Sequence, residues 1–236
     1  MKAIILAAGK GERMLPLTKT IPKPLIPVSG RPILDRLFEA MPEEITDVMI
    51  VVLYLAEKIQ EHCGNNFHGR KISYAQGSAE GNAKSFLAAK DFVRNEPRFL
   101  LLQGDELPYW KDIKHCLDFP SSTLCFEVED PWNHGVAMLR PDGTIESVVE
   151  KPKEPASNLV NDGVMVLTPK IFDCFPEIGP MGEYYFSGMF NQYIKKEKVT
   201  AVKTQYGWVG FSSPADIIHI EEILKQRPAL TRLEIE

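Results

Sequence analysis

Residues 1–34 read MKAIILAAGKGERMLPLTKTIPKPLIPVSGRPIL and carry the strongest structural signal in the chain. The apolar run at residues 3–6 has the length and branched side chains of a buried parallel strand. It leads into small residues at 7–12, whose glycines allow a sharp turn and let backbone N–H groups approach a ligand. Arg13 and Lys23 add positive charge on either side of this loop. Since open α/β sheets bind ligands at the carboxyl ends of their strands, the pattern predicts a phosphate-binding loop.

Two better-known glycine loops do not fit this stretch. The dinucleotide-binding fingerprint requires a third glycine where the chain has Met14, and the Walker loop requires Ser or Thr where it has Gly11. A purely structural turn remains the alternative, although such a turn does not need two glycines together with Arg13 and Lys23.

Composition predicts an ordinary globular protein. The chain has 236 residues, 44% hydrophobic and 25% charged, which suits one α/β domain with a substantial core. A net charge of -5 argues against a broad nucleic-acid-binding surface. No apolar run is long enough for a signal peptide or a membrane span, so we expect a cytoplasmic protein without a membrane partner. The four cysteines form no C-x-x-C pair, which favours reduced, packed thiols.

Hydrophobic periodicity alternates between strands and helices along the first half of the chain. This rhythm predicts right-handed crossovers and a mixed, mostly parallel sheet flanked by helices, with a β-rich insertion at about 123–167. Expected strands lie at 3–6, 48–53, 71–74, 99–102, 123–128, 134–139, 145–149, 164–167 and 200–203. Expected helices lie at 33–41, 55–63, 83–93, 112–117, 171–175, 184–196 and 213–224.

Polar residues after several of these elements are candidate ligand contacts. The Gln76 amide can pair with a pyrimidine edge and Gly81 allows close approach, although a capped loop explains both equally well. Asp105 ends a buried strand and is well placed for a hard cation, although a lone Asp there is more often a turn residue. The Glu150-Lys151 pair precedes a proline and reads by itself as a solvated turn.

The N-terminal residues also resemble the signature of the sugar-1-phosphate nucleotidylyltransferases. The matching residues are Leu6-Ala7-Ala8-Gly9-x-Gly11-x-Arg13-Met14-x-Pro16-Leu17-Thr18, then Pro22-Lys23-Pro24-Leu25-x-Pro27-Val28-x-Gly30-x-Pro32. The resemblance implies a single Rossmann-like α/β nucleotidyltransferase domain over residues 1–236. Its nucleotide-binding part would span about 1–120 and its sugar-binding part about 121–225.

The resemblance also implies a role for individual residues. Arg13 would face the departing pyrophosphate, Lys23 would reach the phosphates, and Lys151 would neutralise the sugar phosphate. Asp105, in a Gly-Asp pair, would bind Mg²⁺. The implied nucleotide contacts are Leu6, Ala7, Ala8, Gly9, Gly11, Gln76, Gly81 and Gln103. The implied sugar contacts are Gly135, Glu150 and Asn161.

The implied reaction joins a nucleoside triphosphate to a sugar 1-phosphate and releases pyrophosphate. The spacing of Gln76 and Gly81 is similar to that of dTDP-glucose pyrophosphorylases, so dTTP or UTP is favoured. No hexapeptide array is present, which argues against the appended acyltransferase that some relatives carry. The sugar, the base and the oligomeric state stay open, with Leu230 and Leu233 available for a contact between subunits.

The chain departs from the family pattern near its end. Residues 208–214 read WVGFSSP where the family has Trp-x-Asp-Ile-Gly-Thr-Pro, so Gly210 replaces the second magnesium ligand. Ser187-Gly188 likewise replaces a Thr-Asp pair. One reading is that Asp105 binds Mg²⁺ alone or with help from Asp162 or Ser212, because Mg²⁺ often uses one or two carboxylates. The alternatives are an impaired or regulatory homologue and a cytidylyltransferase acting on a non-sugar phosphate.

Overall fold

The computed structural model describes residues 1–179, 182–204, 210–211 and 213–226, and only the backbone of Asp162. Trp208, Ser212, Leu230 and Leu233 therefore lie outside the described residues.

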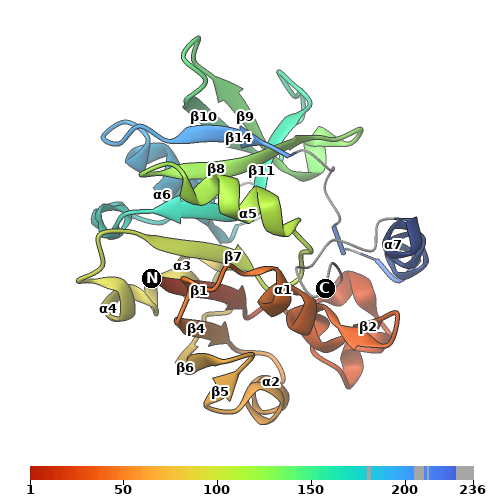
Figure 1. The fold of residues 1–236 in the computed structure, drawn as a ribbon. Helices are drawn as coiled ribbons and strands as arrows, with labels where there is room; N and C mark the ends of the chain where they lie inside the picture. Colours follow the sequence, from red (N-terminus) through yellow and green to blue (C-terminus); the bar gives the residue numbers. More distant parts are fainter. Residues whose placement is uncertain (180–181, 205–209, 212, 227–236) are drawn as a thin grey trace.

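A ten-stranded mixed sheet forms the centre of the molecule (Figure 1). Its strands are β1 (Lys2–Ala7), β4 (Asp47–Val52), β5 (Asn66–Phe67), β6 (Arg70–Gln76), β7 (Phe99–Gln103), β8 (Ser122–Glu127), β9 (Gly135–Leu139), β10 (Ile145–Glu150), β11 (Leu159–Leu167) and β14 (Thr200–Lys203). The order across the sheet is β10-β9-β11-β7-β1-β4-β6-β5, and β8 pairs with both β11 and β14. Two small ribbons join β2 (Pro27–Val28) to β3 (Arg31–Pro32), and β12 (Glu177–Ile178) to β13 (Tyr184–Tyr185).

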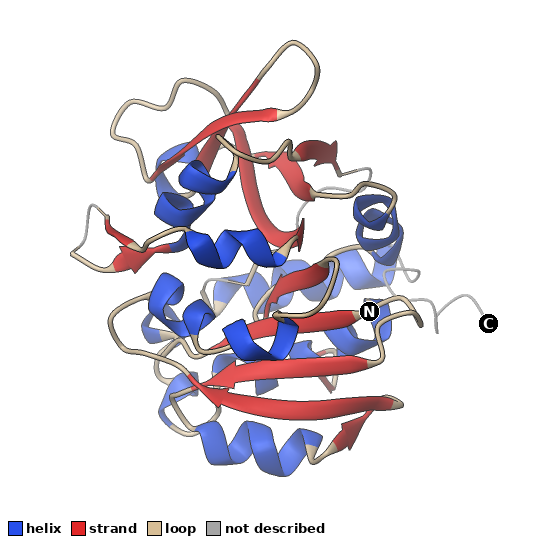
Figure 2. Cartoon of the chain, turned by 90° about the vertical axis from the view of Figure 1, so that its left-hand side faces the viewer, coloured by secondary structure: helices blue, strands red, loops and turns tan. Residues whose placement is uncertain are grey.

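Helices lie on both faces of the sheet (Figure 2). The helices are α1 (Ile33–Ala40), α2 (Ala56–Cys63), α3 (Asn82–Leu87), α4 (Lys90–Val93), α5 (Trp110–Leu117), α6 (Phe186–Tyr193) and α7 (Ala215–Gln226). Of these, α7 packs beside β2. Single 3-10 turns occur at Glu12–Met14, Leu17–Lys19, Lys23–Leu25, Pro131–Asn133 and Pro169–Asp173.

The central strand β1 explains why both faces are covered. It pairs in parallel with β4 and β7, and its apolar side chains alternate between two cores. Ile4 and Leu6 pack with α3, α4 and α6, whereas Ile5 and Ala7 pack with α1, α2 and α5. A strand buried on both faces must be a continuous apolar run, as this one is. The predicted fold, a mostly parallel sheet between helices, is confirmed in the N-terminal half.

The β-rich part continues the same sheet instead of forming a separate one. Strand β11 pairs antiparallel with β7, β8 and β9, which joins the two halves through backbone hydrogen bonds. Strands β9 and β10, which match the strands expected at 134–139 and 145–149, form a hairpin at its far edge. The sheet is thus parallel around β1 and antiparallel beyond β7, with β14 parallel to β8.

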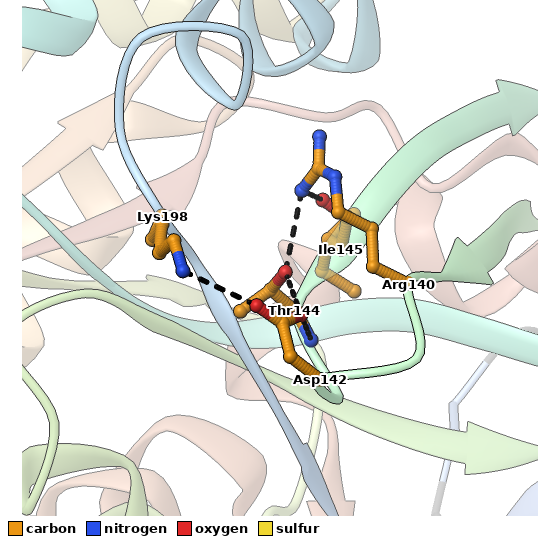
Figure 3. Close-up of polar contacts among 5 residues, drawn as sticks. All are labelled: Arg140, Asp142, Thr144, Ile145 and Lys198. Atoms are coloured by element: carbon orange, nitrogen blue, oxygen red, sulfur yellow. Dashed lines mark hydrogen bonds and ion pairs between the residues drawn. The ribbon is translucent and has the colours of Figure 1, made fainter.

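The turn of the β9–β10 hairpin is fastened to the start of β14 (Figure 3). The Asp142 carboxylate accepts hydrogen bonds from the Thr144 hydroxyl at 2.6 Å and the Thr144 N–H at 3.1 Å. It also contacts Lys198 Nζ at 3.2 Å. These contacts, the Thr144 hydroxyl first, lower the pKa of Asp142 to about 2. The contacts of Asp142 with Thr144 and Lys198 are therefore strongest when its carboxyl group is ionised, and in that form they hold the hairpin.

Several expected elements differ from the structure. The helix expected at 83–93 is divided into α3 and α4, because Ala88 and Ala89 donate to carbonyls three residues back and tighten the turn. The helix expected at 171–175 is instead a 3-10 helix at Pro169–Asp173. Tyr184 and Tyr185 pair with β12, so α6 begins at Phe186. Strand β11 begins at Leu159 because its first residues pair with β8.

The cysteines match the expectation of packed thiols. All four are buried and none forms a disulfide. Burial raises the pKa of Cys63, Cys116 and Cys125 to about 12, which keeps these thiols protonated and unreactive. In the described part of the chain, no helix is long and apolar enough to cross a membrane.

Candidate active site

The glycine loop after β1 is shaped by one residue that must be glycine. Gly11 has φ +64°, and a Cβ there would lie 2.9 Å from Thr18 Cγ2 and 3.1 Å from Lys23 Cβ. The Thr18 hydroxyl donates to the Gly11 carbonyl at 2.9 Å. Gly9 is different, because nothing lies within 4 Å of its missing Cβ. The loop therefore packs tightly where it approaches Lys23 and is open at its tip.

Two predicted site residues from distant parts of the sequence form an ion pair. Lys23 Nζ contacts Asp105 Oδ2, and both side chains are partly exposed. Gly104 brings the end of β7 against β1, since its N–H donates to the Leu6 carbonyl at 2.9 Å and a Cβ would lie 3.1 Å from Ala7 Cβ. The carboxyl ends of the parallel strands thus carry both an ammonium and a carboxylate, as the sequence predicted for a phosphate and cation site.

A cleft of about 510 Å³ joins this region to the β-rich half of the molecule. Eight predicted site residues line it, namely Arg13, Lys23, Gln103, Asp105, Gly135, Glu150, Lys151 and Asn161. They come from the loop after β1, the end of β7 and the neighbouring ends of β9, β10 and β11. No ion pair within the described part of the chain involves Arg13, whose exposed guanidinium is available to a ligand.

The other predicted nucleotide contacts lie beside the cleft and do not line it. These are Leu6, Ala7, Ala8, Gly9, Gly11, Gln76 and Gly81. Ala7 and Gln76 both pair with Val52, so they end the two strands β1 and β6 on either side of β4. Ala8 packs against Gly77, where a Cβ would lie 2.7 Å from the Ala8 Cβ. Their contact with a nucleotide stays a prediction.

The structure gives a reason for the glycine at position 81 that the sequence did not reveal. A Cβ there would lie 2.4 Å from the Tyr184 carbonyl oxygen, and the residue has φ +132°. The expected close approach therefore exists, but its partner in the folded chain is the backbone of β13. The Tyr184 N–H donates to the Glu80 carbonyl at 2.8 Å, which fixes this contact.

The three predicted sugar-binding residues converge on one point. Gly135 and Glu150 are partners in the β9–β10 register. A Cβ on Gly135 would lie 3.3 Å from Asn161 Oδ1 and 3.6 Å from Glu150 Oε2. The absence of a side chain at Gly135 therefore lets an amide and a carboxylate approach the same space. Such a set of donors and acceptors suits hydroxyl groups.

Lys151 is held in an unusual conformation next to this set. Its φ is +43°, a region that residues with a side chain rarely adopt, and its N–H donates to the His134 carbonyl at 2.9 Å. Its Nζ lies 3.3 Å from the Tyr185 hydroxyl and 5.1 Å from the centre of that ring. The ammonium is thus presented to the cleft against an aromatic ring.

The position that departs from the family pattern lies next to Asp105. Gly210 forms an antiparallel bridge with Glu106, so the expected aspartate position borders the cleft but offers no carboxylate. Glu106 is 8% exposed, and a Cβ on Gly163 would overlap its carboxylate at 1.7 Å. Within the described residues, no group of three or more His, Cys, Asp or Glu side chains is arranged to hold a metal.

Sequence reasoning missed several residues that line the cleft. They are Asn82, Asp130, Asn133, Tyr185, Phe186, Ser187, Phe190, Asp216 and His219. Tyr185, Phe186 and Phe190 fall within the helix expected at 184–196, and they are buried while also lining the cleft. Asp216 and His219 face the cleft from α7, whose position depends on packing beside β2 (Figure 1). Helical spacing alone gave no signal for either group.

Comparison with known proteins agrees with this geometry. Residues 2–227 match the family described as nucleotidyl transferase. The chain is 35% identical to the bifunctional protein GlmU of Methanocaldococcus jannaschii over 95% of its own length, but it spans only about half (54%) of that relative. It is 32% identical to the UTP–glucose-1-phosphate uridylyltransferase AglF of Haloferax volcanii, covering 96% of this chain and 97% of that one.

Solved structures show the same architecture. A Bacillus anthracis protein assigned as a glucose-1-phosphate thymidylyltransferase superposes with a TM-score of 0.80 at 26% identity, over 94% of each chain. A UDP-glucose pyrophosphorylase superposes with a TM-score of 0.79 at 23% identity, over 96% of this chain and 98% of that one, and supports the fold.

Proposed function

We propose, since this chain belongs to the nucleotidyl transferase family, that it joins a nucleoside triphosphate to a sugar 1-phosphate and forms an NDP-sugar and pyrophosphate. One observation carries the proposal. A single cleft brings Arg13, Lys23 and Asp105 together with the convergent set Gly135, Glu150 and Asn161. The first group suits phosphates and the second suits sugar hydroxyls.

The proposed reaction is a displacement at the α-phosphorus of the nucleotide. A phosphate oxygen of the sugar 1-phosphate forms the new bond to this phosphorus, while the bond from the α-phosphorus to the bridging oxygen breaks. That oxygen leaves with pyrophosphate and its electron pair. Phosphoryl chemistry of this type depends mainly on positioning and on stabilising negative charge.

The cations of the cleft have distinct proposed roles. Arg13, with its exposed guanidinium, would stabilise the departing pyrophosphate. Lys23, at the strand ends, would reach the phosphates near the reacting phosphorus, and Lys151 would neutralise the sugar phosphate. Glu150 and Asn161 would bind sugar hydroxyls beside Lys151. The nucleotide-binding part would then span about residues 1–120 and the sugar-binding part about 121–225.

The residues present fit Mg²⁺, which the family resemblance implies. Asp105 presents a partly exposed carboxylate to the cleft at the strand ends, next to a cationic side chain that also suits phosphate. Asp105 would hold the ion with Glu106 adjacent, and one or two carboxylates are enough when phosphates and waters complete the shell. The bound ion supplies positive charge that neutralises the phosphates.

UTP and glucose 1-phosphate are the first pair to test. The AglF relative, which this chain matches over nearly its whole length, is named for that pair. The exposed Gln76 and the Gly9–Gly11 tip are proposed to receive the base and the phosphates. The pair dTTP and glucose 1-phosphate comes second, because the Bacillus anthracis structure carries that assignment.

A specific observation supports an impaired homologue as the second candidate. Gly210 borders the cleft where the family pattern has a carboxylate. An impaired protein would bind nucleotide without releasing pyrophosphate.

The test is a matrix of nucleoside triphosphates and sugar 1-phosphates with Mg²⁺, read as pyrophosphate release. CTP without a sugar phosphate, but with alcohol phosphates, is included for the cytidylyltransferase alternative. A pair that requires both substrates supports the proposal. Nucleotide binding by thermal shift with no release from any pair would overturn it in favour of the impaired homologue.

A further inference from the structure

The position of the Lys151 ammonium depends on more than its own backbone. The backbone is fixed by its left-handed φ and by the hydrogen bond to the His134 carbonyl. The side chain, however, has four rotatable bonds and a strongly hydrated head group, which is entropically costly to hold in one place. A lysine that must meet a phosphate at one point gains from a contact that restricts these bonds.

Tyr185 provides such a contact. Its hydroxyl accepts a hydrogen bond from Lys151 Nζ at 3.3 Å, and its ring centre lies 5.1 Å from the same atom. The ring is 9% exposed, so the cation–π attraction acts in a partly desolvated place. A lysine ammonium has three donors, and the bond to the Tyr185 hydroxyl uses only one of them. The tyrosine orients the ammonium without cancelling its charge.

Tyr185 is itself held firmly. Glu177 pairs with it across β12 and β13. A Cβ on Gly179 would lie 2.1 Å from Tyr185 Cδ2, so the ring packs directly on the backbone at that glycine. The ring therefore has little freedom to follow a moving lysine.

The backbone on both sides of Tyr185 is fastened to the loop that precedes α3. The Tyr184 N–H donates to the Glu80 carbonyl at 2.8 Å, and the Phe186 N–H donates to Asn82 Oδ1 at 2.8 Å. Both contacts belong to the segment at residues 76–84 that the sequence predicts to hold the nucleobase. Tyr185 thus stands between the loop at residues 76–84 and the lysine of the β-rich half.

We propose that Tyr185 is a positioning residue that sets the Lys151 ammonium at a fixed place relative to the loop at residues 76–84. Its hydroxyl and ring orient the lysine, and the bonds to Glu80 and Asn82 fix the backbone that carries it. This inference rests on the proposed function through the assignment of Lys151 to the sugar phosphate. It adds a residue that acts through Lys151 and does not itself contact the reacting atoms.

A double-mutant cycle tests the inference with UTP and glucose 1-phosphate, or with whichever pair the matrix shows to be most active. The variants are Tyr185→Phe, Lys151→Met and the pair combined. Tyr185→Phe should raise the KM for the sugar phosphate about fivefold, as expected for one modest hydrogen bond, with little change in the KM for the nucleotide. In the Lys151→Met background the same change should have less than a twofold effect, because the lysine is already gone.

Tyr184→Phe is the matched control. Its ring faces Lys84, with Nζ 4.6 Å from the ring centre, so removing this hydroxyl should leave both KM values near the wild-type values. Tyr185→Leu, which removes the ring as well, should raise the KM for the sugar phosphate further, to about tenfold or more. Thermal unfolding of each variant separates these effects from a loss of folding.

The outcomes separate the inference from the proposed function. Equal effects of Tyr185→Phe with and without Lys151 would overturn the positioning role and leave the activity standing. A Lys151→Met variant with wild-type kinetics would overturn both the lysine assignment and the positioning role. If the wild type shows no turnover, calorimetry with glucose 1-phosphate decides. The positioning role is supported if Tyr185→Phe weakens the binding of glucose 1-phosphate in the wild-type background but not in the Lys151→Met background. Unchanged binding by Tyr185→Phe overturns the positioning role.

Discussion

The two lysines that line the cleft are held in opposite ways. Lys23, at the ends of the parallel strands, contacts the Asp105 carboxylate. Lys151, at the end of the antiparallel hairpin, rests against the hydroxyl and ring of Tyr185. One cation therefore contacts a carboxylate, and the other contacts the hydroxyl and ring of a tyrosine.

This difference bears on what each side of the cleft can bind. We call the side with Lys23 and Asp105 the wall around Lys23, and the side with Lys151 and Tyr185 the wall around Lys151. A carboxylate next to an ammonium lowers the net charge of the pair, but it also offers oxygen ligands to a hard cation. A neutral hydroxyl orients an ammonium and leaves its charge available to an incoming anion. The contact between Lys23 and Asp105 is therefore consistent with the proposed binding of a polyphosphate together with Mg²⁺, and the contact between Lys151 and Tyr185 is consistent with the proposed binding of the sugar phosphate.

The largest expected effect comes from the charged partner. Asp105→Asn keeps the shape of the side chain and removes its charge, so it should lower kcat by about three orders of magnitude if the carboxylate holds the metal. Pyrophosphate release at saturating substrates measures this. Asp118→Asn, at an exposed carboxylate after α5, is the control and should have wild-type activity. A loss of less than tenfold in Asp105→Asn would remove the contrast between the two walls.

Arg13→Ala should come next. Losing one charge-stabilising donor for the departing pyrophosphate should lower kcat by about two to three orders of magnitude. Arg94→Ala is the matched control, because Arg94 is exposed on the surface and pairs with Asp91 away from the cleft. Near-normal turnover of Arg13→Ala would refute the assigned role.

Gly210→Asp sharpens the contrast by adding a carboxylate to the wall around Lys23. Because Gly210 borders Glu106 and the cleft, the new carboxylate should lower the Mg²⁺ concentration for half-maximal activity by several-fold. A Mg²⁺ titration of pyrophosphate release measures this, and Gly210→Asn, which lacks the charge, serves as the control. An equal shift in both variants would show that the charge at this position is irrelevant.

The smallest effect concerns the turn of the β9–β10 hairpin, the hairpin that Lys151 follows in the chain. The pKa of Asp142 is about 2 in the folded chain, below the ordinary value of 3.8, so its ionised form stabilises the fold. This contribution is present above about pH 4 and is lost as the pH falls from 4 to 2. Asp142→Asn should therefore have a lower Tm than the wild type at pH 7, with a difference that shrinks below pH 4. A difference independent of pH would contradict this.

Much of this architecture could be predicted from local sequence patterns. The strand at β1, the glycine loop and the alternation that follows were visible because burial on both faces requires unbroken apolar runs. The eight predicted residues that line the cleft were predicted from the resemblance to the nucleotidylyltransferase family. The beginning of β11 was missed because Asn161 and Gly163 read as a turn, and pairing with β8 and β9 overrides that preference.

Other parts depend on contacts between distant segments. Tyr185 has the spacing of a core residue, and its second role arises only because β13 passes beside Lys151. Gly81 was expected to make room for a ligand, whereas the space beside it holds the Tyr184 backbone. No local pattern distinguishes a glycine that admits a ligand from one that admits another strand.

The pairing of β11 with β7 sets the spacing between the two walls. Val164 pairs with Leu102 in antiparallel register, and Asn161 and Asp105 each lie three residues beyond this pair in the same direction, with a register shift in β11 between Asn161 and Met165. Hydrogen bonds between strands resist sliding, because a shift by one residue would turn every side chain to the other face. The pairing of β11 with β7 therefore limits how far Asp105, proposed to bind the metal, can move from Asn161, proposed to bind the sugar. Acceptors would be selected by the span between their phosphate and their hydroxyl groups, and no hinge across β7 and β11 could adjust that span.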